Sequence, residues 1–126
     1  MSSKEILVVD DDNDDIEIFV EAINSLNKDL ICRSSFNPAK TLADLSSCEK
    51  LPDLILLDYN MPSINGLEFI QQLKADQKLS GIEVVMMSTP NVELMVPWLL
   101  KNNITARYIA KPDSFEKLKI ILNNIL

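Results

Sequence analysis

The sequence predicts an α/β fold, in which a doubly wound, five-stranded parallel sheet carries helices on both of its faces. Short, continuous apolar runs alternate along the chain with segments whose apolar residues recur every three or four positions. A continuous apolar run is typical of a strand buried on both faces, and the longer spacing is typical of an amphipathic helix. Because a helix between two strands makes a crossover connection, regular alternation places the strands parallel. The 126 residues contain no repeat and no linker, so we expect a single domain over residues 1–126.

The first half of the predicted fold contains three strands and two helices. Residues 6–9 form a continuous apolar run, and residues 16–26 carry apolar side chains at helical spacing. Residues 30–35 predict a weaker strand, whose arginine and serines indicate an edge of the sheet. A proline can occupy the first turn of the helix predicted for residues 38–47. Residues 54–57 are again continuously apolar and predict a second strongly buried strand.

The second half continues the same alternation. Residues 66–73 carry a helical stripe, and residues 84–87 predict a third buried strand. Residues 92–102 also have a helical pattern, although a proline interrupts it. Residues 108–110 predict the last short strand, and residues 115–125 predict the closing helix. By analogy with known open sheets of this kind, we expect the flavodoxin-like strand order 2-1-3-4-5.

Composition and charge exclude several classes of protein. The 12 basic and 19 acidic residues give a net charge of −7, which argues against direct nucleic-acid binding because that function needs clustered basic residues. No apolar run approaches the ~18–20 residues of a membrane span, and the N-terminus lacks a signal-peptide pattern, so we expect a cytoplasmic protein without membrane insertion. The two cysteines have no metal-type spacing, which favours a reduced pair. The chain has no histidine, which excludes Ser-His-Asp and Cys-His catalysis, His-ligated zinc and a phosphohistidine of its own.

Polar side chains follow four of the predicted strands at the point where each strand ends. Asp10 and Asp11 follow the first strand, Asp58 the third, Ser88 the fourth and Lys111 the fifth. In open parallel sheets, ligands bind just beyond the carboxyl ends of the strands. We therefore expect these carboxylates, the hydroxyl and the ammonium group to converge at one edge of the sheet.

This combination of groups points to phosphoryl chemistry. Crowded carboxylates raise one another's pKa unless a cation neutralises them, and Mg²⁺ is favoured because it binds few carboxylates and keeps several waters. Lys111 would add a fixed positive charge opposite Asp58. A metal cation and an ammonium group on either side of one carboxylate neutralise a phosphoryl group during its transfer.

Each of these residues also has an ordinary structural explanation. Asp12, Asp14 and Asp15 lead into a predicted helix, where acidic side chains favour the positive end of the helix dipole, and we expect that role for them. The strand-end residues are individually weak signals, because aspartate, serine and lysine end many strands. Their occurrence together at four strand ends is what makes the pattern specific.

The sequence resembles the receiver domain of two-component response regulators, of the stand-alone, CheY-like kind. Four segments carry the resemblance, in the expected order and spacing: residues 6–11, residues 57–67, Ser88 and residues 108–112. The segment at 57–67, Leu-Asp-Tyr-Asn-Met-Pro-Ser-Ile-Asn-Gly-Leu, is the most specific of them. The likeness extends from the first predicted strand to the final helix.

The resemblance implies a role for each residue of the site. Asp58 would be phosphorylated from a phosphohistidine on a partner, either a sensor histidine kinase or a histidine phosphotransfer protein. Asp11 and Asp58 would ligate Mg²⁺ directly, together with the backbone carbonyl of Asn60. Asp10 would act mainly through a metal-bound water. The chain would assist its own phosphorylation and dephosphorylation without being a turnover enzyme on an external substrate.

The same resemblance implies a conformational switch that changes the binding of a downstream protein. Lys111 would contact the phosphoryl group, Ser88 would move to hydrogen-bond it, and Tyr108 would change rotamer as Ser88 moves. The Lys111–Pro112 peptide bond is expected to be cis, a form that only X-Pro bonds readily adopt.

The chain departs from the family pattern mainly near its fourth helix and fifth strand. Thr89 and Pro90 follow Ser88 where the family usually has a small residue, Pro97 falls within the helical pattern, and Asp113-Ser114 precede Phe115. These departures affect the expected phosphorylation lifetime and the surface that receivers commonly use for output.

Two other functions fit parts of the pattern. One is a receiver-fold adaptor that works without phosphorylation, although the presence of all the strand-end residues argues against it. The other is a small Mg²⁺-dependent aspartyl phosphohydrolase with Asp58 as nucleophile. Such enzymes usually have a second aspartate two residues later, where this chain has Asn60.

Overall fold

The structure is a computed structural model that describes residues 4–47, 50–58, 66–88, 97, 100–101 and 107–126, with the backbone alone at residues 66, 67, 88 and 108. Five parallel strands form one sheet in the order β2-β1-β3-β4-β5. The strands are β1 (Lys4–Val9), β2 (Leu30–Ser35), β3 (Leu54–Asp58), β4 (Glu83–Ser88) and β5 (Arg107–Ala110). The described helices are α1 (Asn13–Asn24), α2 (Pro38–Ser47), α3 (Gly66–Ala75) and α5 (Phe115–Ile125).

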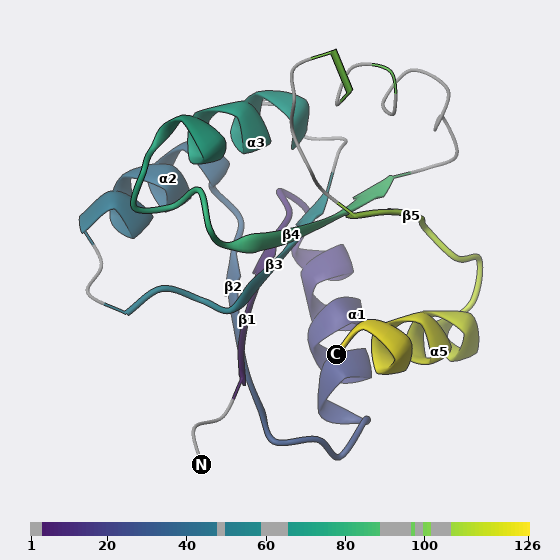
Figure 1. The fold of residues 1–126 in the computed structure, drawn as a ribbon. Helices are drawn as coiled ribbons and strands as arrows, with labels where there is room; N and C mark the ends of the chain where they lie inside the picture. The colour runs from purple at the N-terminus through teal and green to yellow at the C-terminus, as the bar shows by residue number, and fades with distance from the viewer. Residues whose placement is uncertain (1–3, 48–49, 59–65, 89–96, 98–99, 102–106) are drawn as a thin grey trace.

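The predicted fold class, strand order and edge strand are confirmed. The sheet is covered by α1 and α5 on one face and by α2 and α3 on the other (Figure 1). The weaker strand, β2, lies at the edge of the sheet, as its polar residues indicate. Most of the helical pattern at 92–102 lies outside the described residues, but Pro97, Leu100 and Lys101 have helical backbone.

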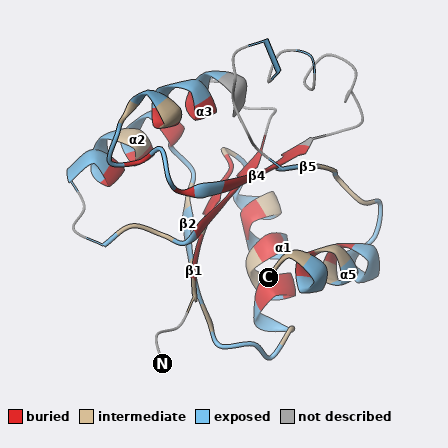
Figure 2. Ribbon diagram, in the orientation of Figure 1, coloured by how far each residue is buried: buried red, intermediate tan, exposed pale blue. Residues whose placement is uncertain are grey.

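The strand β3 shows why continuous apolar runs form the centre of this sheet. Leu54 and Leu56 point to the α1 and α5 face, whereas Ile55 and Leu57 point to the α2 and α3 face. All four side chains are at most 2% exposed, so each alternate residue is buried under a different helix layer (Figure 2). Such burial on both faces contributes about 1.5–3 kcal/mol for each large apolar side chain.

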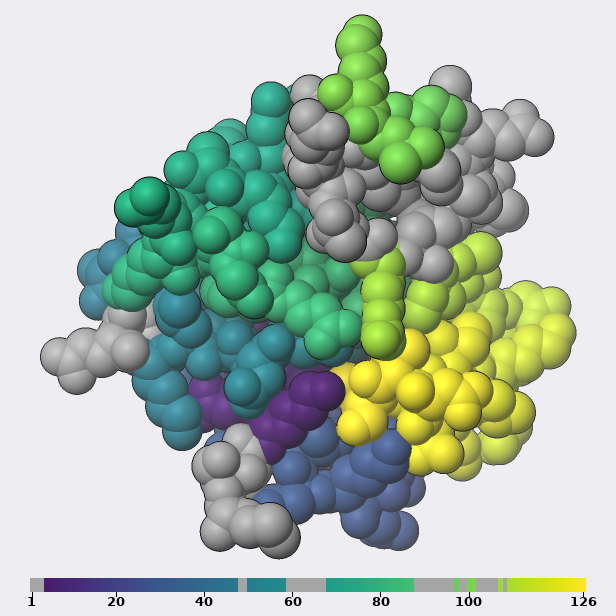
Figure 3. All heavy atoms as spheres, viewed as in Figure 1, coloured from purple at the N-terminus to yellow at the C-terminus, as the bar shows by residue number. Residues whose placement is uncertain are grey.

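The first and last helices pack together on one face of the sheet. Helices α1 and α5 pack against each other, so that the C-terminal helix lies beside the first helix (Figure 3). Asp12 caps the N-terminus of α1, because its side chain accepts a hydrogen bond of 2.9 Å from the amide of Asp14. Ser114 caps α5 in the same way by accepting from the amide of Lys117. These caps fix where each helix begins relative to the strand before it.

Two remaining expectations concern cysteines and membranes. Cys32 is a free, half-buried thiol, and Cys48 lies outside the described residues. None of the helices among the described residues is long and apolar enough to cross a bilayer.

Candidate functional site

The pairing register of β1 and β3 places the acidic ends of these two strands next to each other. Val9 of β1 lies opposite Leu57 of β3, and Asp10 and Asp58 directly follow these two residues. Because β1 and β3 are neighbours and parallel, both carboxylates emerge at the same edge of the sheet. The apolar residues before them are buried under helices on both faces, which holds the two strand ends in place.

Asp11 joins these two carboxylates to form an acidic cluster. Asp10, Asp11 and Asp58 each offer a carboxylate oxygen, and these oxygens lie within 4.8 Å of one another. Asp10 and Asp58 are only 1% and 5% exposed, and Asp11 is half-buried. The structure therefore confirms that these three side chains converge, as their positions at strand ends predict.

Asp10 carries a strong electrostatic penalty in this position. Its Oδ1 accepts a hydrogen bond of 3.0 Å from the amide of Asp12, while its buried Oδ2 has no hydrogen-bond partner among the described residues. Burial, together with the negative charges of Asp58 and Asp15, raises the pKa of Asp10 to about 7, against the lowering effects of the Asp12 amide and the Lys111 ammonium. An aspartate with the ordinary pKa of 3.8 would be almost fully ionised at pH 7.

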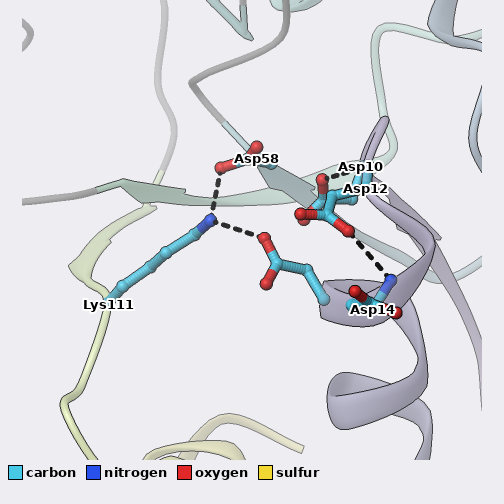
Figure 4. Close-up of polar contacts among 6 residues, drawn as sticks. Asp10, Asp12, Asp14, Asp58 and Lys111 are labelled. Carbon is cyan, nitrogen blue, oxygen red and sulfur yellow. Dashed lines mark hydrogen bonds and ion pairs between the residues drawn. The ribbon is translucent and has the colours of Figure 1, made fainter.

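Lys111 supplies the positive charge of the site. Its Nζ lies 2.8 Å from Oδ1 of Asp58 and 3.4 Å from Oδ2 of Asp15, with a side chain only 22% exposed. Figure 4 shows Lys111 extended toward Asp58 and the acidic residues that follow β1. Burial alone lowers the pKa of Lys111, but the hydrogen bond and charge of Asp58, with the charges of Asp15 and Asp10, together outweigh burial, so the pKa is raised and the ammonium stays charged.

The chemistry of this donor set fits a hard divalent cation. Three carboxylates face one another, one lysine offsets only part of their charge, and the buried Oδ2 of Asp10 is left without a donor among the described residues. Mg²⁺ prefers oxygen ligands and retains waters, so a few convergent carboxylates suit it. The residues present therefore fit Mg²⁺.

Comparison with known families agrees with this geometry. Residues 6–123 match the response regulator receiver domain. The chain belongs to this family. A receiver domain is a signalling domain of response regulators, and the acidic cluster at this edge of the sheet is consistent with that function.

Three similar proteins match this chain over nearly its full length. A chemotaxis protein CheY homolog of Campylobacter jejuni is 27% identical over 121 residues, which cover 96% of this chain and 91% of the relative. The crystal structure of the phosphorylated cyanobacterial phytochrome response regulator RcpA is 28% identical, with a TM-score of 0.85 and coverage of 98% and 91%. The Mn²⁺-bound response regulator Rcp1 is 25% identical, with a TM-score of 0.81 and coverage of 97% and 91%.

Three predicted residues of the receiver domain are described only in part or not at all. Ser88 ends β4 opposite Ala110, and Tyr108 lies on β5 opposite Met86, but both side chains fall outside the described residues. Asn60, with its backbone carbonyl, also lies outside them. Their proposed roles therefore stay predictions.

The expected cis bond between Lys111 and Pro112 is wrong for this structure. No peptide bond among the described residues is cis, so this bond is trans. The trans form is favoured by about 0.5–1 kcal/mol even before proline, and here it still brings Lys111 Nζ to Asp58.

Sequence reasoning missed the part that Asp15 plays in the site. We expected only a helix-dipole role, and Asp15 does lie in the first turn of α1, but its carboxylate also pairs with Lys111. Helical spacing offered a signal, because Asp15 lies four residues before the buried Phe19 on α1.

Proposed function

We propose that this receiver domain accepts a phosphoryl group on Asp58 from a phosphohistidine of a sensor histidine kinase or histidine phosphotransfer protein. The observation that carries the proposal is the setting of Asp58, a buried carboxylate 2.8 Å from the Lys111 ammonium and within 4.8 Å of two other carboxylates. A nucleophile flanked in this way has a cation on one side and a metal-binding cluster on the other. The absence of histidine in the chain agrees with a donor on another protein.

The transfer would be a displacement at phosphorus. A carboxylate oxygen of Asp58 would attack the phosphorus atom and form a P–O bond, while the P–N bond to the partner's imidazole breaks. The electron pair of that bond would stay on the imidazole nitrogen, which takes up a proton. Lys111 would follow the negative charge from the carboxylate to the phosphoryl oxygens. Attack by water on the same phosphorus would later release inorganic phosphate and restore Asp58.

Mg²⁺ is the proposed cofactor of this reaction. Asp11, Asp58 and the backbone carbonyl of Asn60 would hold it directly, and Asp10 would hold it through a metal-bound water. When bound, Mg²⁺ would neutralise negative charge on the carboxylates and on the phosphoryl oxygens. Two similar response regulators support this proposal, since RcpA has a structure in the phosphorylated form and Rcp1 has one in an Mn²⁺-bound form.

Phosphorylation would change the binding of a downstream protein. The Ser88 hydroxyl would hydrogen-bond the phosphoryl group, and Tyr108 would move into the space that Ser88 leaves. Support comes from the backbone, because β4 lies between β3, which ends at Asp58, and β5, which carries Tyr108.

The chain would assist its own phosphorylation and dephosphorylation and would not turn over an external substrate. Since phosphohistidine is made from ATP, we expect this role in the cytoplasm.

The test is incubation of the protein with acetyl phosphate, a small phosphodonor, followed by intact mass measurement. In this reaction the P–O bond to the acetyl group breaks and acetate leaves with the electron pair. We expect an adduct of one phosphoryl group to form in the presence of Mg²⁺. No adduct should form when EDTA replaces Mg²⁺ in the incubation. A phosphorylation-independent adaptor would give no adduct under either condition, and that result would reject the proposal.

A further inference from the structure

Lys111 has two acidic partners that come from different elements. Asp58 ends β3, whereas Asp15 lies in the first turn of α1, and both carboxylates contact the Lys111 Nζ, at 2.8 and 3.4 Å. Asp15 is absent from the group of carboxylates able to share a metal ion among the described residues. Its carboxylate is therefore a partner of the ammonium group and offers no ligand atom to the acidic cluster.

A helix-dipole role alone does not explain where Asp15 points. Asp14 also lies in the first turn of α1, yet it is exposed, whereas Asp15 is half-buried with a side chain 38% exposed. Asp15 lies on the same helix face as Phe19, which is buried against Leu118 of α5 in one core cluster. The packing of α1 on α5 therefore turns Asp15, but not Asp14, toward the segment that carries Lys111.

The phosphoryl transfer proposed above gives Asp15, the second partner of Lys111, a role in holding the ammonium group. The carboxylate of Asp58 is paired with Lys111 at 2.8 Å, and it loses its negative charge when one of its oxygens bonds to phosphorus. While the Lys111 ammonium moves from this carboxylate to the phosphoryl oxygens, a mostly buried ammonium held by no other group would be strongly disfavoured. Asp15 offers the same ammonium a contact that does not involve the attacking carboxylate.

We propose that Asp15 is a positioning residue for phosphorylation, which holds the Lys111 ammonium at the mouth of the site while Asp58 forms its bond to phosphorus. This inference rests on the proposed function, because it assumes that Asp58 is the phosphoacceptor. It concerns the rate of bond formation and predicts little change in the binding of the metal or of the phosphodonor. Asp15 acts only through Lys111 and does not touch the reacting atoms.

The test compares Asp15→Asn with the matched control Asp14→Asn. Both changes remove one negative charge from the first turn of α1, so both raise the net charge from −7 by one and weaken the same helix-dipole interaction. For each protein, the maximal rate of phosphorylation and the half-saturating concentration of acetyl phosphate are measured by mass spectrometry in saturating Mg²⁺. The Kd for Mg²⁺ is measured by calorimetry.

We expect Asp15→Asn to lower the maximal rate about threefold relative to Asp14→Asn, the effect of losing one partly exposed ion pair. The half-saturating concentration of acetyl phosphate and the Kd for Mg²⁺ should stay within about twofold of their values in Asp14→Asn. Asp15→Glu, which keeps the charge, should recover at least part of the lost rate, which a purely local packing defect would not allow.

Two results would overturn the inference while leaving Asp58 as the phosphoacceptor. One is an equal maximal rate in Asp15→Asn and Asp14→Asn, and the other is a loss in Asp15→Asn that Asp15→Glu does not relieve. If the unaltered protein forms no adduct at all, the proposed function itself fails, so the two failures are distinguishable.

Discussion

Val9 and Leu57 lie opposite each other on the neighbouring strands β1 and β3, and the residue that follows each of them is a buried aspartate. This one register relationship brings Asp10 and Asp58 together at the carboxyl edge of the sheet. A shift of one residue in either strand would turn one carboxylate to the opposite face and would separate the pair. The metal-binding and phosphoacceptor roles proposed here both depend on this alignment.

Asp11 should matter more for Mg²⁺ binding than its neighbour Asp12. Asp11 contributes to the acidic cluster, whereas Asp12 uses its side chain to cap α1. We expect Asp11→Asn to raise the Kd for Mg²⁺ about tenfold or more, and Asp12→Asn to change it less than threefold, because asparagine keeps the capping oxygen. Calorimetric titration of both variants checks this, and equal losses would indicate a diffuse acidic patch.

Asp10 should make the metal-free protein less stable as the pH rises. Its pKa is about 7 in the folded protein and near the ordinary 3.8 when unfolded, so the folded state holds a proton between these values that the unfolded state has lost. The free energy of unfolding therefore falls as the pH rises through this window, and the penalty is complete above about pH 7.

Replacing the carboxyl group should remove this dependence. We expect the stability advantage of Asp10→Asn over the unaltered protein to grow by about 1–3 kcal/mol between about pH 5 and pH 8 in EDTA. Urea unfolding at both pH values measures it, with the exposed Asp14→Asn as control. A pH-independent advantage would show that Asp10 does not titrate in this range.

Lys111 should affect metal binding and phosphorylation in opposite directions. Its ammonium occupies Oδ1 of Asp58 at 2.8 Å and partly neutralises the cluster. Lys111→Met would remove this competing charge, so we expect the Kd for Mg²⁺ to fall about threefold. The rate of phosphorylation by acetyl phosphate should fall about tenfold or more, because no ammonium then stabilises the transferred group. Parallel losses in both measurements would instead indicate a general collapse of the site.

The proposed switch makes a prediction for Ser88. If its hydroxyl binds the phosphoryl group, Ser88→Ala should weaken the change in Trp98 fluorescence that phosphorylation produces, while the Kd for Mg²⁺ stays nearly constant. Trp98 is the single tryptophan of the chain, so the signal has one source. An unchanged fluorescence signal in the fully phosphorylated, unaltered protein would contradict the proposed coupling.

The sequence was sufficient to predict the sheet and the acidic cluster. Continuous apolar runs such as residues 54–57 occur where both faces of a strand are covered, and the side chains after such runs must emerge at one edge. Asp10, Asp11, Asp58 and Lys111 could therefore be placed together from strand-end position alone. Element boundaries were less accurate, since β1 begins at Lys4, two residues before the predicted start.

Two features of the site depend on tertiary structure and could not be derived in this way. The Asp15 contact with Lys111 requires the packing of α1 on α5, which the local pattern around residue 15 does not determine. The isomer of the Lys111–Pro112 bond depends on an energy difference of only about 0.5–1 kcal/mol, which the surroundings can reverse. The structure has this bond in the trans form.

The central claim is that Asp58 is the phosphoacceptor, and the most direct measurement is the stoichiometry of phosphorylation in Asp58→Asn. Asp44→Asn is the matched control, because Asp44 is an exposed aspartate on α2 and its replacement changes the net charge equally. With acetyl phosphate and Mg²⁺, intact mass measurement should show one phosphoryl group on the unaltered protein and on Asp44→Asn, and none on Asp58→Asn. A full-yield adduct on Asp58→Asn would contradict the claim.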